Sequence, residues 1–167
     1  TIVVHPLPTV IPSVTTQSFC SGGTTNINLL SNVPGHTFSW TATATTITGQ
    51  SGSVTGSGAT SINQTLTLNA GQVAAGQVTY TIVAEANGCS GTPQIVRVYV
   101  NPIPDLTVAS SSVPLCSGDT TNISFTGTIP GTVFNWVVTN STGVTGATNG
   151  SGTSIQQVLI ATSLTQG

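Results

Sequence analysis

Apolar and polar residues alternate along two stretches of the chain and predict β-strands. Between residues 78 and 86 apolar side chains occupy every second position, and Val96, Val98 and Val100 do the same further on. A period of two places one face of a strand against a core and the other in solvent. No stretch carries the apolar stripe that an amphipathic helix needs. We therefore expect an all-β protein.

Turn-forming residues divide this pattern into short strands. Val33-Pro34-Gly35 carries the Pro-Gly of a tight turn, and Asn87-Gly88 is a strong hairpin signal. Seven short strands separated by turn signals at intervals of about 8 to 12 residues indicate an immunoglobulin-like sandwich of two sheets. The expected strands cover residues 9–14, 24–30, 37–42, 51–54, 61–68, 78–86 and 94–100.

The chain repeats itself with a period of 96 residues. The stretch "CSGGTTNINLLSNVPGHTFSW", Cys20 to Trp40, returns as "CSGDTTNISFTGTIPGTVFNW", Cys116 to Trp136, with 11 of 21 positions identical. After the tryptophan the match loosens in a segment rich in Gly, Ser and Thr, and it resumes at Ile62 and Ile155. The sequence therefore predicts two copies of one unit.

Pro-x-Pro steps at residues 6–8 and 102–104 mark the junctions between copies. Proline stiffens a short linker and denies backbone donors to a continuing strand, so we expect successive sandwiches to be held end to end. Three segments are expected: residues 1–5 as the last strand of a preceding repeat, 6–101 as one complete repeat, and 102–167 as an incomplete second repeat that lacks its last two strands.

Composition narrows the range of partners. The 167 residues are 37% hydrophobic but only 2% charged, and 32 threonines supply neutral hydroxyls for a wetted surface. With one Lys or Arg and a net charge of −2, the chain is poorly suited to nucleic acid or anionic membranes. It has neither a membrane-inserting run nor a signal peptide, and we expect it to be an interior part of a longer protein.

The repeated motifs resemble a known family. "CSG(G/D)TTNI", then "VPG" or "IPG", then "F-x-W", "VTYTI", "ANGC" and "VYVNPIP" resemble the PKD-like, immunoglobulin-like tandem repeats of giant Bacteroidota cell-surface adhesins, including gliding-motility adhesins. The resemblance implies export by type IX secretion, attachment at the outer membrane, and a stalk or filament that bears a distal binding region. It implies no catalytic residues.

Cys20, Cys89 and Cys116 stand at repeating positions and suggest disulfides in an oxidising, extracellular setting. One pairing joins Cys20 to Cys89 inside a repeat. In a seven-strand sandwich, however, the loops that hold them lie at opposite ends, beyond the roughly 7 Å limit between Cα atoms. On that geometry each Cys of the first kind would bond to the Asn-Gly-Cys loop of the next repeat. Free buried thiols are the third possibility.

Aromatic residues recur on the third predicted strand. Phe38, Trp40, Phe134 and Trp136 are expected in the core, where immunoglobulin sandwiches place a tryptophan. A role in stacking on a ligand would need an exposed indole beside other aromatic rings.

Candidate chemistry elsewhere is sparse. His5 and His36 have no counterparts in the other copy, and Asp105 and Asp119 lie near no other acid, so neither a metal site nor a cofactor is expected. No serine or threonine has a His–Asp partner arrangement, and we expect no enzyme activity. By the family resemblance, "DTT" marks Thr120 as a possible O-glycosylation site.

The repeat favours a structural function. We expect a non-catalytic stalk or filament segment of a large secreted adhesin, involved in surface attachment or gliding motility. Its partners would be adjacent repeats, other copies in a filament or bundle, and polysaccharide or solid surfaces reached through a distal region. Two alternatives are a carbohydrate-binding β-sandwich module and an accessory domain of a secreted hydrolase.

Overall fold

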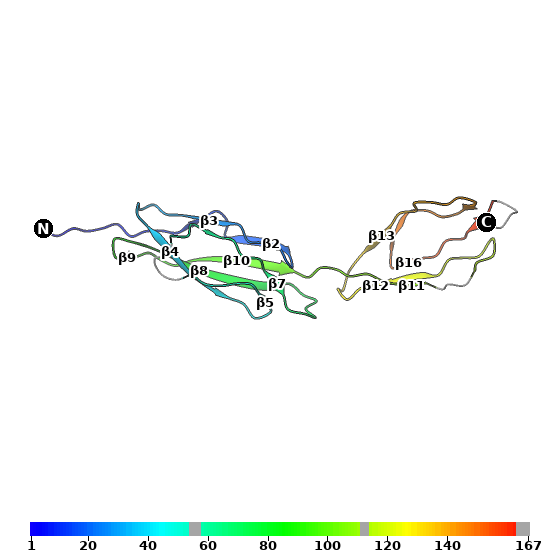
Figure 1. The fold of residues 1–167 in the computed structure, drawn as a ribbon, viewed down its shortest axis with the longest axis horizontal. Coiled ribbons are helices and arrows are strands. Elements are labelled where there is room, and N and C mark those ends of the chain that lie inside the picture. The colour runs from blue at the N-terminus through cyan, green and yellow to red at the C-terminus, as the bar shows by residue number, and fades with distance from the viewer. Residues whose placement is uncertain (54–57, 111–113, 163–167) are drawn as a thin grey trace. The chain divides into compact units, whose positions relative to one another are not determined.

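The computed structural model describes residues 1–53, 58–110 and 114–162, and the chain divides into two compact units. Unit 1 comprises Thr1–Ile103 and unit 2 comprises Pro104–Gly167. Every regular element in the described ranges is a β-strand, which confirms the all-β prediction (Figure 1). Within those ranges no helix is long and apolar enough to cross a membrane.

The larger sheet of unit 1 contains the longest strands. Its order is β2 (Thr16–Cys20), β10 (Gln94–Asn101), β8 (Gly76–Ala86) and β4 (Thr37–Thr43), and the short β9 (Cys89–Ser90) also pairs with β8. β8 runs antiparallel to both β10 and β4, whereas β2 runs parallel to β10. Figure 1 shows β8 and β10 side by side in green.

Shorter strands lie opposite this sheet and complete the sandwich. β3 (Ile27–Leu30) pairs with β1 (Ile11–Pro12) and with β6 (Ser61–Ile62), and β5 (Ile47–Thr48) pairs with β7 (Thr67–Leu68). The inward side chains form one apolar core, which consists of Val10, Ile27, Leu29, Phe38, Trp40, Ile47, Ile62, Leu66, Leu68, Val78, Tyr80, Ile82, Ala84, Val96, Val98 and Val100. The alternating residues of β8 and β10 form one wall of this core.

The structure differs from the expected strands in several places. β2 lies in a stretch where no strand was expected, and residues 9–14 contribute only the two residues of β1. Residues 51–53 form no strand, and Val54 lies outside the described residues. Residues 1–10 are also outside the strands. The assignment of residues 1–5 to a preceding repeat stays a prediction.

Unit 2 reproduces the smaller sheets of unit 1. β12 (Ile123–Thr126) pairs with β11 (Thr107–Ser110) and β16 (Ser154–Ile155), as β3 pairs with β1 and β6. β14 (Val144–Thr145) pairs with β17 (Ile160–Ala161), as β5 pairs with β7. β13 (Phe134–Trp136) pairs with β15 (Gly150–Gly152). Within the described part of unit 2 no strand corresponds to β8 or β10.

Candidate functional site

The aromatic residues of the repeat have different surroundings in the two units. In β4, Phe38 is 1% exposed and Trp40 is 7% exposed, and the Trp40 indole donates to the Ser51 carbonyl at 3.1 Å. In β13, Phe134 and Trp136 are only half-buried. The Trp136 indole nevertheless donates to the Thr148 carbonyl at 3.0 Å. The same indole bond therefore forms with and without a closed core.

The cysteines of unit 1 lie at opposite ends of its larger sheet. Cys20 is in register with Asn101 at the end of β10, and Cys89 is in register with Ala86 at the end of β8. Because Val100 pairs with Gly76, the two levels are separated by about ten residues of β8, roughly 33 Å. A disulfide needs Cα atoms within about 7 Å, so a Cys20–Cys89 bond inside unit 1 is excluded.

All three thiols are free in the structure. Cys20 and Cys116 are exposed, and Cys89 is half-buried. Because none of the three side chains is fully buried, the structure argues against the possibility that they are buried, inert thiols.

Thr120 lies on the surface of unit 2. It is exposed and forms an isolated antiparallel bridge with Val158. Its neighbour Asp119 accepts a hydrogen bond from the Cys116 backbone N–H at 2.7 Å. The Thr120 hydroxyl is therefore accessible to a modifying enzyme.

The histidines lie apart from any cluster. His5 is exposed, whereas His36 lies 2.7 Å from the Val33 carbonyl and 4.9 Å, between ring centroids, from Phe38. Across the described residues, no three His, Cys, Asp or Glu side chains come together as a metal site would require.

A glutamine that sequence reasoning missed organises the polar interior of unit 1. Gln64 donates to the Ser51 carbonyl at 2.8 Å, and its Oε1 accepts from the Tyr80 hydroxyl at 2.7 Å. Tyr80 is fully buried, and burial raises the pKa of its phenol to about 12. A signal was present in the sequence, because Gln64 and Gln157 each stand two residues after the matched isoleucines Ile62 and Ile155.

A threonine next to this glutamine is also repeated. The Thr25 hydroxyl donates to the Ile62 carbonyl at 2.8 Å and accepts from the Gln64 backbone N–H at 2.8 Å. In unit 2, the Thr121 hydroxyl makes the same two bonds with Ile155 and Gln157, at 3.0 and 2.9 Å. The Thr-Thr-Asn-Ile motif therefore supplies a polar clasp between the start of β3 and its neighbour β6 in unit 1, and between the start of β12 and its neighbour β16 in unit 2.

Asp105 fixes the start of unit 2. Its Oδ1 accepts from the Thr128 backbone N–H at 2.6 Å and from the Thr128 hydroxyl at 2.9 Å. These bonds, the backbone one first, lower the pKa of the Asp105 carboxyl. In unit 1 the matching bond runs from the Thr9 backbone N–H to Asn32 Oδ1 at 2.8 Å. Both units therefore tie their first segment to the loop before the aromatic strand.

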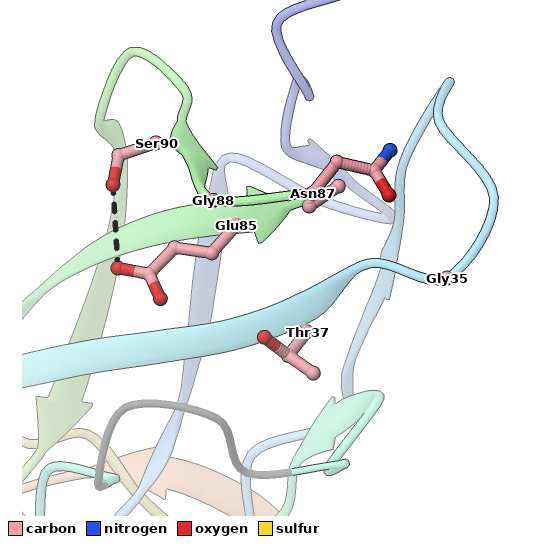
Figure 2. Close-up of a pocket in the computed structure, with 7 residues that line it drawn as sticks. Gly35, Thr37, Glu85, Asn87, Gly88 and Ser90 are labelled. Carbon is pink, nitrogen blue, oxygen red and sulfur yellow. Dashed lines mark hydrogen bonds between the residues drawn. The ribbon is translucent and has the colours of Figure 1, made fainter. Parts of the chain in front are cut away.

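Figure 2 shows a small polar hollow beside the β8–β9 hairpin of unit 1. It measures about 360 Å³, and Ser90 donates to the Glu85 carboxylate at 3.3 Å. Gly35 and Thr37 line its other side. The hollow offers one carboxylate, whereas Ca²⁺ takes about six to eight oxygen ligands.

Unit 2 carries an apolar groove of about 350 Å³. Leu106, Phe125, Phe134 and Trp136 form its apolar wall, and the aromatic rings lie against one another with centroids 5.6 and 5.8 Å apart. These side chains match core residues of unit 1. The groove is thus an uncovered half of a sandwich rather than a built ligand site.

Comparison with known proteins gives one family match. A model described as the PKD-like domain matches residues 17–104 and again residues 113–166. PKD-like domains are structural, adhesion-type modules and are typically non-catalytic. Comparison with curated proteins finds no match.

Two solved structures share a general likeness with the chain. One is described as protocadherin gamma B2 extracellular cadherin domains 3–6 (12% identity, TM-score 0.33) and the other as a protocadherin gammaB7 EC3–6 cis-dimer structure (13% identity, TM-score 0.36). The alignments cover 92% of this chain but only 38% and 39% of those chains.

Proposed function

Because the chain belongs to the PKD-like domain family, we propose that it is a non-catalytic structural segment of a large secreted cell-surface adhesin. In this role, repeats of one sandwich form a stalk or filament that carries a distal binding region away from the cell. The process served is surface attachment or gliding motility. Residues 6–101 are then one complete repeat and 102–167 an incomplete one.

The family match to both copies supports this proposal most directly. The repeated clasp of Thr25 and Thr121 adds to it, because both copies retain the same pair of side-chain hydrogen bonds between neighbouring strands of one sheet. Repeats of this kind contact mainly their neighbours, which suits a load-bearing spacer.

Two modifications belong to the same proposal. Cys20, Cys89 and Cys116 form disulfides with cysteines of neighbouring repeats, since an internal bond in unit 1 is excluded by distance. Thr120, which is exposed, carries an O-linked glycan in the native host. The intact mass of the native protein tests the glycan, and an unmodified mass would reject it.

Antibodies raised against the chain test the proposed location and function. Intact cells of the source organism should be labelled, and brief protease treatment of those cells should remove the label. Deletion of the gene should reduce attachment to a solid surface or gliding. An antibody against a cytoplasmic protein is the control. Labelling that requires permeabilised cells would contradict the proposal.

The carbohydrate-binding alternative predicts a different result. Trp40 is buried and Trp136 lines the open half of a sandwich, so neither indole forms a flat exposed platform for sugars. On a glycan array the chain should bind no polysaccharide. Saturable binding that is lost in Trp136→Ala would favour the alternative.

A further inference from the structure

The outer face of the larger sheet in unit 1 carries mostly short, neutral side chains. Because side chains alternate along a strand, the residues between the core positions of β8, β10 and β4 point away from the core. Neighbouring threonines fill much of this face: Thr16, Thr41, Thr43, Thr79 and Thr81. Val83 and Ile95, which is 41% exposed, form a small apolar centre. Sheet faces can pack against each other at about 10 Å.

Two charged side chains stand at separate places on this face. Arg97 is exposed on β10, opposite Thr79, and Glu85 is half-buried on β8, six residues beyond Thr79. The two positions are therefore roughly 20 Å apart, whereas an ion pair needs atoms within about 4 Å. Arg97 is the one Lys or Arg of the chain, and Glu85 is the one acid in the sequence of unit 1. Neither can therefore find an oppositely charged side chain within unit 1.

Glu85 lies in the polar hollow of about 360 Å³ beside the β8–β9 hairpin (Figure 2). Ser90 donates to its Oε1 at 3.3 Å, and Thr37 and Asn87 add further oxygen atoms to the lining. An arginine guanidinium carries five N–H donors in a planar fork and binds carboxylates with two parallel hydrogen bonds. The hollow therefore has the chemistry of a guanidinium site.

The arrangement of the two charges is self-complementary. In a two-fold contact between identical chains, the same two residues meet twice, once on each side of the axis. If the axis lies in the plane of contact midway between Arg97 and Glu85, each Arg97 faces the Glu85 of the other copy. The centre of the contact then falls near the level of Ile82, where Thr81, Val83 and Ile95 point outward. A second copy has the required charges at the required spacing, whereas any other partner would need to match both.

We propose that two copies of the chain associate face to face through the larger sheet of unit 1, with Arg97 of each copy in the polar hollow of the other, against Glu85. Four strands spaced about 4.8 Å apart and about 25 Å long give about 500 Å² on each copy. The total of about 1,000 Å² is at the lower limit of specific interfaces, so the dimer is weak. The inference does not depend on the proposed adhesin function.

Sedimentation of the full chain over a range of concentrations tests the contact. We expect a monomer–dimer equilibrium that shifts toward monomer as salt is added, because ions screen charge pairs at the surface. Arg97→Glu and Glu85→Arg should each weaken association by at least about tenfold, since the two-fold axis repeats each change. Asn28→Arg, at an exposed position of the smaller sheet, is the control for altered charge and should leave association unchanged.

Mixing the two charge-reversed proteins tests the pairing itself. Arg97→Glu carries two acids on the face and Glu85→Arg carries two arginines, so each repels its own copies. An equimolar mixture should associate, because every acid of one protein then faces an arginine of the other. The double variant Arg97→Glu/Glu85→Arg should associate like the original chain for the same reason. Circular dichroism confirms that each variant is folded.

Three results would overturn the inference. The first is an original chain that stays monomeric at every concentration and at low salt. The second is association that Arg97→Glu and Glu85→Arg leave unchanged, which would assign the contact to another face. The third is loss of association in the single variants that neither mixing nor the double variant restores, which would mean that Arg97 and Glu85 do not face each other.

Discussion

Single buried side chains show how the interior of unit 1 accommodates polarity. Tyr80 places its hydroxyl on Gln64, and Thr25, 1% exposed, uses its hydroxyl both as donor and as acceptor. Burying a polar group costs free energy unless the group is hydrogen-bonded. Substitutions at these two positions should therefore have distinct and measurable effects.

Tyr80 should make unit 1 sensitive to alkaline pH. Its pKa is raised to about 12, above the value near 10 of an unfolded chain, so the folded state holds this proton more tightly. The corresponding part of the free energy of unfolding is present below about pH 10 and is lost as pH rises through 12. Urea unfolding between pH 7 and 11.5 measures the slope.

Tyr80→Phe should remove this alkaline loss and cost about 1 kcal/mol at pH 7, for one hydrogen bond. Tyr99→Phe, at a half-buried position on β10, is the matched control and should retain the slope. An unchanged alkaline slope in Tyr80→Phe would assign the effect to another group.

Thr25→Val should destabilise unit 1 by about 1–3 kcal/mol. The substitution keeps the shape of the side chain but removes the buried hydroxyl that donates to the Ile62 carbonyl and accepts from the Gln64 N–H. Thr121→Val removes the same bonds in half-buried surroundings, where water can replace them, and should cost less. Equal costs, measured by chemical unfolding, would contradict the role given to burial.

At the scale of elements, strands with one apolar face could be predicted from the sequence. A strand without such a face, which forms because it pairs with a distant strand, could not. β8, β4 and β10 alternate with a period of two, and the structure places strands close to the expected bounds. β2 was missed because, among the described residues, its one strand partner is β10, more than 70 residues later in the sequence. The residues of β2 are also exposed or half-buried, without an apolar face. Pairing with a distant strand leaves no local pattern.

The candidate site was predictable to a similar extent. The repeated motifs identified the aromatic strand and the cysteines. They did not show that Phe38 and Trp40 would be buried while Phe134 and Trp136 would be only half-buried. Burial depends on β8 and β10, which contribute to the core of unit 1 alone. The role of Gln64 also required the fold, because Tyr80 comes 16 residues later and meets it only across the sandwich.

The positions of the cysteines on the larger sheet give a prediction at this scale. In the Cys116→Ser protein, oxidation by diamide at low concentration should leave both remaining thiols of the monomer free, because Cys20 and Cys89 lie at opposite ends of the sheet. Cross-links should form only between chains. Thiol titration and non-reducing gels measure this, and a monomer with Cys20 bonded to Cys89 would disprove the assigned register.

For the molecule as a whole, one residue reports the opening of unit 1. The chain has one Lys or Arg, and this residue, Arg97, lies within β10 between Thr16 of β2 and Thr79 of β8. Trypsin should leave the folded chain intact, because cleavage needs β10 to leave the sheet. The rate of cleavage to fragments 1–97 and 98–167 should follow the free energy of opening.

The destabilised Thr25→Val protein should therefore be cut faster than the original chain, and Thr121→Val should be cut at the original rate. Mass spectrometry of timed samples checks both. Rapid cleavage of the original chain while its circular dichroism stays native would mean that β10 opens locally.

The parallel pairing of β2 and β10 has a mechanical consequence. Their five register pairs run from Thr16 opposite Arg97 to Cys20 opposite Asn101. Because the strands point the same way, and one lies near the start of unit 1 and the other at its end, tension on the two ends pulls them in opposite directions along one axis. The hydrogen bonds between them are then loaded together in shear and cannot open one at a time like a zipper.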